Sequence, residues 1–485
     1  MKRIDFALRH ALHSVAATRR IELAAQEALP SHVLMQRAGL ALAQLALALA
    51  PHSRRPWIAC GPGNNGGDGM EAAMHLQQWG KRPVVTWLGH ADTAPPDAQA
   101  SWQRALDAGV EFAEEAPIDF DFGIDALLGI GATRAPEGRM AKWIDLLNTS
   151  DATVLAVDIP TGLHADTGHA GPSCVKAHHC LSLLTLKPGL FTGHGRDAAA
   201  TVWLDDLQIE QNRSAAITHD AWLAGAPTRQ TRRLHASHKG SYGDVAIVGG
   251  APGMTGAALL AASAALHAGA GRVFVGLLDG ASLSTDTSRP ELMFRPIEAL
   301  EFKSMTVVCG CGGGDAIRSY LPKILSSAAR LVIDADALNA IATDSQLQTL
   351  LSARTRRFAS TVLTPHPLEA ARLLGNTAAQ VQGDRLAAAQ RLAVRFGCTV
   401  VLKGSGSVIA APGQTPVLNP TGNARLATAG SGDVLAGLIG AGLATESPSW
   451  RVSCEAVFQH GLKADHWPDD LPLTAGALAR SLQPI

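Results

Sequence analysis

The most specific chemical pattern in this chain lies at residues 423–437, which read NARLATAGSGDVLAG. Small residues from Thr428 to Asp433 run directly into an apolar segment that begins at Val434. This is typical of a helix N-terminus that binds an anion, because glycine lets the backbone approach phosphate and the helix dipole favours negative charge. Asp433 would then stand where it could remove a proton from a substrate hydroxyl. A helix N-cap role for Asp433 is equally open on this motif alone.

Further segments of the second half place glycines or polar residues directly after apolar runs: 249–257 (GGAPGMTGA), 310–314 (GCGGG), 334–339 (DADALN), 364–369 (TPHPLE) and 403–407 (KGSGS). His366 stands between two prolines, and this rigidity makes it a candidate ligand. Lys403, followed by alternating Gly and Ser, suits a nucleotide phosphate or ribose, although the GxxxxGK spacing of a P-loop is absent. An ordinary hairpin turn with a solvated lysine is the alternative.

The first half contains a comparable turn at Gly61–Gly69, which reads GPGNNGGDG and follows an apolar run ending at Cys60. Five glycines and a proline in nine residues predict a tight turn, with a helix expected from Asp68. The amides of Asn64 and Asn65 could bind a hard cation or hold a ligand. A loop in which asparagine only tolerates positive φ is the alternative.

Two carboxylates close predicted strands in the same half, Asp125 in FGIDALLG and Asp158 in VLAVDIPTG. In an open parallel sheet, ligands bind outside the carboxyl ends of the strands, so we expect both acids to converge with the Gly61 turn. Asp158 is the candidate acid/base, and Thr161 would present oxygens nearby. The loop Gly129–Arg134 could cover a phosphate. Each acid taken alone is also compatible with a cap or turn role.

Short apolar runs alternate with helical patterns throughout, which predicts an α/β chain with mostly parallel strands. Expected strands are 57–60, 84–88, 123–127, 154–158, 181–186, 245–248, 273–275, 306–309, 331–334, 361–363 and 399–402, with a hairpin at 407–418. Expected helices are 34–50, 68–79, 98–108, 142–147, 256–268, 384–396, 434–442 and 451–466. The polar segment 211–238, with its basic cluster Arg229, Arg232 and Arg233, is the expected domain boundary.

Length and composition limit the class of protein. The chain has 485 residues, which favours two domains, and 47% are hydrophobic. A formal net charge of −1 argues against nucleic acid or an anionic membrane as a partner and favours a small molecule. Seven scattered cysteines without CxxC pairs argue against a disulfide framework. No secretory signal pattern is visible, so we expect a cytoplasmic protein.

The motifs GPGNNGGDG, IDALLGIGATR and VDIPTG, in this order, resemble the NAD(P)H-hydrate epimerase domain over about residues 1–212. The resemblance implies a Rossmann-like three-layer αβα fold and a potassium ion held by Asn65, Asp125 and Thr161, where Thr161 replaces the more common Ser. It also implies that the hydrated nicotinamide nucleotide contacts Asn64, Asn65, Gly66, Gly67, Asp68, Gly129, Ile130, Gly131, Ala132, Thr133, Arg134, Ala135 and Asp158.

The second-half motifs DADALN, TPHPLEA, KGSGS and NPTGNARLATAGSGDVLAG resemble the ADP/ATP-dependent NAD(P)H-hydrate dehydratase domain, which is ribokinase-like, over residues 235–485. Residues 213–234 would then be a linker. The resemblance implies an adenine nucleotide, with magnesium, held by Lys403, Gly404, Ser405, Gly406, Ser407 and Gly432. It implies substrate contacts from Ala257, Gly312, Gly314, His366 and Asp433. The family usually shows GPGLG where this chain has GCGGG, so Cys311 and Gly313 depart from its pattern.

Together the two resemblances imply a fused repair enzyme that epimerises hydrated NADH or NADPH and dehydrates the S form at the expense of ADP. Asp158 and Asp433 would be its catalytic residues, and a homo-oligomer is expected. One rival hypothesis is a ribokinase-like small-molecule kinase with an inert N-terminal module. The other is a non-enzymatic protein that senses nucleotides or oligomerises through degenerate domains.

Overall fold

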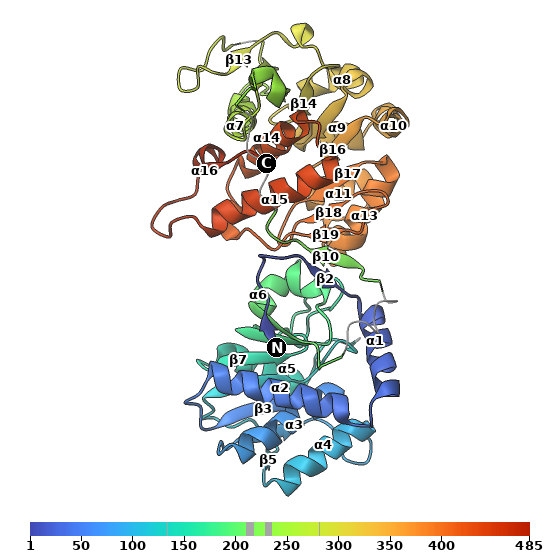
Figure 1. Cartoon of the computed structure of the whole chain (residues 1–485), viewed down its shortest axis with the longest axis vertical. Coiled ribbons are helices and arrows are strands. Elements are labelled where there is room, and N and C mark those ends of the chain that lie inside the picture. The colour runs from blue at the N-terminus through green and yellow to red at the C-terminus, as the bar shows by residue number, and fades with distance from the viewer. Residues whose placement is uncertain (133, 210–217, 228–234, 281) are drawn as a thin grey trace. The chain divides into compact units, whose positions relative to one another are not determined.

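The computed structural model describes residues 1–132, 134–209, 218–227, 235–280 and 282–485. The chain forms two compact units, one made of Met1–Asp5 and His10–Trp222 and the other of Phe6–Arg9 and Leu223–Ile485. Figure 1 shows the elements of each unit. Of the expected linker 213–234, only 218–227 is described. Thr133 and the basic cluster Arg229, Arg232 and Arg233 lie outside the described residues.

The first unit is built on a sheet whose strand order is β1-β9-β8-β7-β6-β3-β4-β5. All neighbouring strands pair in parallel except β1 and β9. The strands are β1 (Lys2–Arg3), β3 (Pro56–Cys60), β4 (Val84–Trp87), β5 (Glu111–Ala113), β6 (Phe122–Ala126), β7 (Thr153–Val157), β8 (His179–Leu183) and β9 (Thr201–Asp205). The helices are α1 (Val15–Ala28), α2 (Val33–Leu49), α3 (Asn64–Gln78), α4 (Pro96–Asp107), α5 (Arg139–Thr149) and α6 (Gly195–Ala199). Two other short strands, β2 (His10–Leu12) and β10 (Ala221–Leu223), are not part of this sheet.

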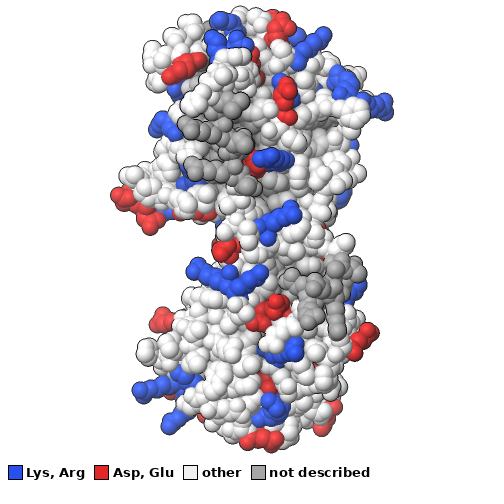
Figure 2. Space-filling view, viewed as in Figure 1, with Lys and Arg blue, Asp and Glu red and all other residues white. Residues whose placement is uncertain are grey.

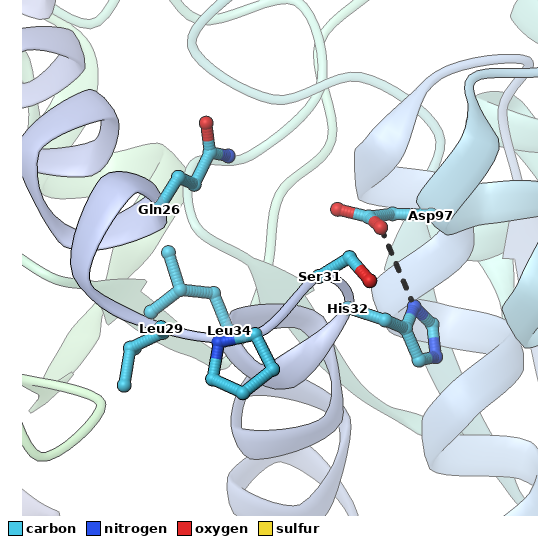
Figure 3. Close-up of a pocket in the computed structure, with 7 residues that line it drawn as sticks. Gln26, Leu29, Ser31, His32, Leu34 and Asp97 are labelled. Atoms are coloured by element: carbon cyan, nitrogen blue, oxygen red, sulfur yellow. Dashed lines mark ion pairs between the residues drawn. The ribbon is translucent and has the colours of Figure 1, made fainter.

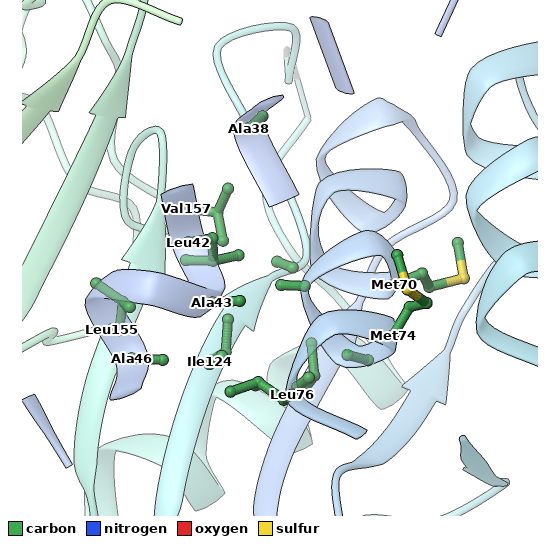
Figure 4. Close-up of a cluster of buried hydrophobic side chains, with 14 of the residues drawn as sticks. Ala38, Leu42, Ala43, Ala46, Met70, Met74, Leu76, Ile124, Leu155 and Val157 are labelled. Carbon is green, nitrogen blue, oxygen red and sulfur yellow. The ribbon is translucent and has the colours of Figure 1, made fainter. Parts of the chain in front are cut away.

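Helices cover both faces of this sheet. Alternate residues of β6 and β7, including Ile124 and Leu155, pack with α2 and α3 in a buried core that Figure 4 shows in close-up. On the opposite face, Trp57 of β3 meets Trp143 of α5, with ring centroids 6.2 Å apart. Because side chains on a strand alternate between faces, one sheet serves both helical layers. The three-layer α/β fold expected for this half is confirmed.

The second unit contains a sheet in which the strands run in the order β13-β12-β11-β14-β15-β16-β17-β18-β19. Strands from β13 to β17 pair in parallel, and β18 and β19 add an antiparallel hairpin. The parallel strands and the hairpin at 407–418 agree with the α/β fold predicted for this half. The strands are β11 (Asp244–Gly249), β12 (Arg272–Leu277), β13 (Met293–Phe294), β14 (Thr306–Cys309), β15 (Arg330–Ile333), β16 (Ser360–Leu363), β17 (Thr399–Leu402), β18 (Val408–Ala410) and β19 (Val417–Leu418).

The helices of this unit include two apolar ones, α7 and α14, that pack closely against each other. A Cβ on Gly437 of α14 would lie 2.1 Å from the carbonyl oxygen of Ala261 in α7, so only glycine permits this approach. The helices are α7 (Thr255–His267), α8 (Leu321–Ser327), α9 (Ala335–Ala342), α10 (Ser345–Ala353), α11 (Pro367–Leu374), α12 (Ala378–Gly383), α13 (Arg385–Phe396), α14 (Ser431–Ala444), α15 (Ser449–Asp465) and α16 (Ala475–Ser481).

The expected strands all occur, two with the predicted ends and the others with ends shifted by up to three residues, whereas most helices begin one to four residues earlier than predicted. Helix α3 begins at Asn64 rather than Asp68, and α14 begins at Ser431 rather than Val434. In α3, Gly66 makes this possible, since a Cβ there would lie 2.1 Å from the Gly61 carbonyl oxygen. Asp433 is therefore the third residue of α14, and Gly430 occupies the N-cap position. Helices α1, α6, α8 to α12 and α16 were not predicted.

Charged residues of both signs are interspersed on the face that Figure 2 shows. In the described part of the chain, no single helix is long and apolar enough to cross a bilayer. Helices α1 and α2 pass that test of length and composition only as a pair bent by 115°.

Gly437→Ala should destabilise the second unit, because the added methyl would push the α14 backbone away from Ala261. We expect a loss of about 2 kcal/mol, or a fall of about 5 °C in the thermal unfolding midpoint. Gly256→Ala in α7 is the matched control, since a Cβ there meets nothing within 4 Å. It should be neutral or stabilising, as alanine favours helix. Equal midpoints for the two variants would contradict this account of the packing.

Candidate active sites in the two units

Strands β3, β6 and β7 of the first unit end at one edge of the sheet, where Asp125 is fully buried. Its carboxylate accepts hydrogen bonds from Thr161 N at 2.8 Å, Thr161 Oγ1 at 2.7 Å and Leu127 N at 3.2 Å. Burial raises the pKa of Asp125 to about 6, although these hydrogen bonds oppose the shift. The structure thus brings together Asp125 and Thr161, as the sequence predicts.

A short loop connects this pair to Asn65. Leu128 N donates to Thr161 Oγ1 at 2.9 Å, and the Cβ position of Gly129 lies 3.0 Å from Asn65 Oδ1. The Asn65 Nδ2 atom is buried and has no hydrogen-bond partner among the described residues. A 180° rotation of the amide exchanges its oxygen and its nitrogen, so the Asn65 side chain can present either atom to a ligand here. Oxygen donors around one buried carboxylate fit a hard cation.

Asp158 follows β7 directly and adopts a left-handed backbone conformation with φ of 65°. Its Oδ1 atom accepts a short hydrogen bond from Lys187 Nζ and another from Leu183 N at 3.2 Å. Lys187 is fully buried and also donates to Leu183 O at 2.8 Å. A positive φ is costly for a residue other than glycine and concentrates at functional sites. Asp158 and Lys187 form a buried ion pair that holds the carboxylate at the strand end.

Lys187 was missed in the sequence, although it follows an apolar run in the same way as Lys403. Glu22 of the unpredicted helix α1 was missed too. Its pKa is raised by burial and then by the charge of Asp158. The pKa of Asp68 is also raised, first by burial and then by the negative charges of Asp158 and Glu22. The site therefore gathers several carboxyl groups around one buried lysine.

The other predicted contacts of this unit differ in exposure. Residues exposed to solvent are Asn64, Gly131, Ala132, Arg134 and Ala135, whereas Gly66 and Gly67 are buried. A Cβ on Gly67 would lie 2.6 Å from Met35 Sδ, so this glycine serves helix packing. Thr133 lies outside the described residues.

A pocket of about 310 Å³ lies where α1 and α2 meet (Figure 3). Its polar side includes His32, whose Nδ1 lies 3.7 Å from Asp97 Oδ1 and whose Nε2 lies 3.5 Å from Glu71 Oε2. None of the predicted site residues lines it; the lining residues are Gln26, Leu29, Pro30, Ser31, His32, Leu34 and Asp97.

In the second unit, the ends of β15 and β17 and the start of α14 bring Asp334, Lys403 and Asp433 together. Lys403 follows β17, and its Nζ donates to Asp334 Oδ1 at 2.7 Å. Thr364 Oγ1 donates to the same oxygen at 2.7 Å. A Cβ on Gly432 would lie 3.3 Å from Lys403 Nζ, so the first turn of α14 stands directly beside the ammonium group.

Asp433 projects from that first turn, and its pKa is raised to about 6, first by burial and then by the charge of Asp334. A hydrogen bond with the Cys311 thiol and the charge of Lys403 oppose the shift. The Cys311 Sγ and one carboxylate oxygen each of Asp334 and Asp433 lie within 4.8 Å of one another, a spacing that a cation could bridge. A carboxylate that titrates near neutral pH suits general-base chemistry.

His366 lies close enough to this cluster for its charges to affect the pKa of the imidazole. Burial lowers its pKa, and the charges of Lys403 and Asp334 act on it as well. The ring also caps α11, since Nδ1 accepts from Leu368 N at 3.1 Å, and Nε2 lies 3.2 Å from Glu369 Oε1. His366, the predicted substrate contact, therefore also stabilises the start of α11.

The glycine turn after β14 borders α7. The Cβ position of Gly312 lies 2.9 Å from Ala257 Cβ, and Gly314 N donates to Asp336 Oδ2 at 2.9 Å. Both glycines have positive φ. Asp334 and Asp336 were not predicted as site residues, although two acids that close a strand were the available signal. In the 403–407 loop, Ser407 Oγ donates to Gly404 O at 3.1 Å.

Each unit thus has a strand-end site with a lysine–carboxylate pair, buried in the first unit and partly exposed at Lys403 in the second, which defines a two-domain α/β enzyme that acts on small molecules. Residues 245–483 match the family model described as NAD(P)H-hydrate dehydratase, and residues 31–189 match that of the YjeF-related protein N-terminus.

Relatives match over nearly the whole chain. The bifunctional NAD(P)H-hydrate repair enzyme Nnr of Escherichia coli (strain K12) is 35% identical over 96% of this chain and 91% of that protein. The bifunctional NAD(P)H-hydrate repair enzyme of Leishmania braziliensis is 35% identical over 91% of this chain and 86% of that protein. The solved ADP/ATP-dependent NAD(P)H-hydrate dehydratase from Bacillus subtilis, co-crystallised with ATP and Mg²⁺, is 28% identical over 52% of this chain and 91% of that chain, with a TM-score of 0.43. The chain belongs to the family of bifunctional NAD(P)H-hydrate repair enzymes.

Proposed function

We propose that the first unit interconverts the R and S epimers of hydrated NADH or NADPH, and that the second dehydrates the S form at the expense of ADP. The observation that carries the proposal is the position of Asp433, in the first turn of α14 beside Gly432 and the Lys403–Asp334 ion pair. Family membership over 96% of the chain supports it.

In the second unit, Asp433 removes the proton from the substrate hydroxyl, whose oxygen then attacks the terminal phosphorus of ADP. A phosphorus–oxygen bond forms, the bond to the departing AMP breaks, and N–H groups at the start of α14 stabilise charge on the moving group. The phosphate then leaves carbon with its electron pair, and the adjacent ring carbon loses a proton. Hydroxide leaves poorly and phosphate leaves well, which accounts for the use of a nucleotide.

Mg²⁺ is the proposed companion of ADP. The carboxylates of Asp334 and Asp433 supply oxygen atoms of the kind that Mg²⁺ selects, whereas the Cys311 thiol is a soft donor that it does not. When bound, Mg²⁺ would neutralise phosphate charge, with most of its ligands from phosphate and water. Lys403 adds a fixed positive charge beside the loop at 403–407, the proposed nucleotide site.

In the first unit, epimerisation exchanges hydroxyl groups between the two faces of a ring carbon. The departing hydroxyl needs a proton donor, the ring passes through an iminium ion, and the returning water needs a base. The Asp158–Lys187 pair contains both a carboxylate and an ammonium group at one place, and no redox group is required. Asn64, Asp68 and the loop at 129–135 would contact the substrate.

Potassium is the proposed ion at Asn65, Asp125 and Thr161. Its bound charge would compensate the buried Asp125 carboxylate, whose partners in the described part of the chain are hydrogen-bond donors. The ion would order the loop that carries Leu128 and Gly129.

Two rival functions make different predictions. A ribokinase-like kinase would release a stable phosphorylated product and regenerate no cofactor. A non-enzymatic nucleotide sensor would bind ADP without turnover of any hydrate. Relatives that match across both units favour the repair reaction over both rivals.

Asp433→Asn should lower the dehydration rate at least a hundredfold, because the amide cannot accept the hydroxyl proton. Recovery of reduced-nicotinamide absorbance from the S hydrate with ADP measures the rate, and calorimetry should find ADP still bound. In the wild type the rate should fall below about pH 6, since the base must be ionised and its pKa lies near that value. A variant that retains more than a tenth of the rate would refute this role.

Asp158→Asn should leave the S epimer repairable and strand the R epimer, apart from spontaneous exchange. Lys187→Met should do the same, because it removes the ammonium group that holds the carboxylate. Mixed epimers followed by chromatography give the measurement, with Asp433→Asn as the control in which the second step alone fails. Equal repair of both epimers by Asp158→Asn would remove this residue from the mechanism.

Potassium should raise the unfolding temperature of the wild-type first unit but not that of Asp125→Asn. A ligand at about 100 times its Kd stabilises a protein by about 2.7 kcal/mol. Thermal unfolding in choline buffer, with and without added potassium, tests this, and lithium is the control ion. Equal stabilisation of the wild type and Asp125→Asn would place the ion elsewhere.

A further inference from the structure

Arg385, the first residue of α13, is 1% exposed and lies at the end of β17. Its Nη2 atom donates to the carbonyl oxygens of Leu402 at 3.2 Å and Lys403 at 3.1 Å, and Nη1 donates to Gln382 Oε1 at 2.6 Å. The guanidinium group therefore ties the last residue of the strand and the first residue of the 403–407 loop to helix α12.

Gly404 passes directly over this group. A Cβ on Gly404 would lie 2.8 Å from both Nη1 and Nη2 of Arg385, and the residue has a φ of 139°. A side chain at this position would collide with the guanidinium, and the backbone angle disfavours one in any case. The path of the loop is thus shaped to the surface of Arg385.

These contacts orient the loop's own hydrogen-bond donors. The Lys403 carbonyl points at Arg385, and in a trans peptide the N–H of the next residue points the opposite way. The Gly404 N–H is therefore directed away from Arg385, while Lys403 N donates to Pro365 O at 2.9 Å. Gly404 and Ser405 are exposed, so a ligand can reach this part of the loop.

A second buried arginine provides a comparison. Arg354 is also 1% exposed and also donates to carbonyl oxygens, those of Leu325, Ala328 and Ser360. Burial lowers the pKa of Arg354 and of Arg385 alike, to about 10. Ser360 begins β16, so Arg354 lies at the amino end of a parallel strand, whereas Arg385 lies at the carboxyl end of its neighbour. Only the latter edge carries the proposed site.

We propose that Arg385 is a positioning residue that fixes the Lys403–Ser407 loop for the nucleotide phosphate. This inference rests on the proposed nucleotide-binding role of that loop. Arg385 acts through the backbone of Leu402, Lys403 and Gly404, and it sets the affinity for ADP without taking part in the chemical steps.

The test uses the full-length protein with Arg385→Lys, Gln382→Leu and the control Arg354→Lys. Lysine keeps the charge but lacks the planar fork in which Nη1 bonds Gln382 while Nη2 bonds both carbonyls. We expect the KM for ADP to rise about tenfold in Arg385→Lys, the loss of one charged hydrogen-bonding arrangement. The kcat value, the KM for the hydrate and the epimerase rate should stay within about twofold, because none depends on the loop in this way. The ADP Kd from calorimetry should follow the KM.

Arg354→Lys should leave the KM for ADP unchanged even where its loss of stability equals that of Arg385→Lys. Gln382 is exposed, so Gln382→Leu keeps the fold, and it should raise the KM about threefold by freeing the guanidinium. If Arg385→Lys fails to fold, the KM for ADP of Gln382→Leu alone tests the inference. An unchanged ADP affinity in the variant that folds, or an equal loss in Arg354→Lys, would overturn the inference.

Measurements on the wild-type protein distinguish a failure of this inference from a failure of the proposed function. Binding of ADP without dehydration of any hydrate would overturn the proposed reaction, and the ADP affinities of the variants would still decide the role of Arg385. A wild-type protein that neither binds ADP nor dehydrates the substrate would overturn both.

Discussion

The ion pair between Lys403 and Asp334 is the interaction on which the second site depends. A buried ammonium or carboxylate alone is costly, and each makes the other tolerable at the end of the sheet. The first turn of α14 lies beside this pair, since a Cβ on Gly432 would be 3.3 Å from Lys403 Nζ. Asp433 is then held near a positive charge and a second carboxylate, and burial brings its pKa to about 6.

The first unit solves the same problem with different residues. Asp158 and Lys187 pair at the end of β7, and Asp125, one strand along, is held by Thr161. In both units parallel strands end at one edge, so polar residues from distant parts of the sequence meet there while the rest of each strand stays buried. A lysine–carboxylate pair at that edge provides a proton donor and acceptor, or a fixed charge for phosphate, without a redox group.

Much of this arrangement could be predicted from the sequence. Apolar runs followed by Asp125, Asp158 and Lys403 gave both the strands and the residues at their ends, because strand periodicity and end polarity are local features. Helix starts were less predictable. Gly66 and Gly432 look like loop residues in sequence, yet both lie in first helical turns, where the missing side chain permits a close approach to the Gly61 carbonyl and to Lys403 Nζ respectively.

Partners that depend on tertiary structure were missed. Asp334 acquires its role from Lys403, which is 69 residues away in the sequence, and Asp158 from Lys187, which is 29 residues away. Arg385 gave no signal because its pattern is that of an ordinary helix start, and only the fold places it beneath Gly404. Local motifs therefore gave the candidate residues at the strand ends but not the residues that hold them in place.

The central claim is that ADP turns a substrate hydroxyl into a phosphate leaving group. The most direct measurement is the fate of the hydroxyl oxygen in S hydrate labelled with heavy oxygen, dehydrated with unlabelled ADP by Asp158→Asn, since the first unit of the wild type would exchange the labelled hydroxyl with water. Because the carbon–oxygen bond would break after phosphorylation, the label should appear in the inorganic phosphate, as mass spectrometry would detect. Label released into water, with unlabelled phosphate, would contradict the account.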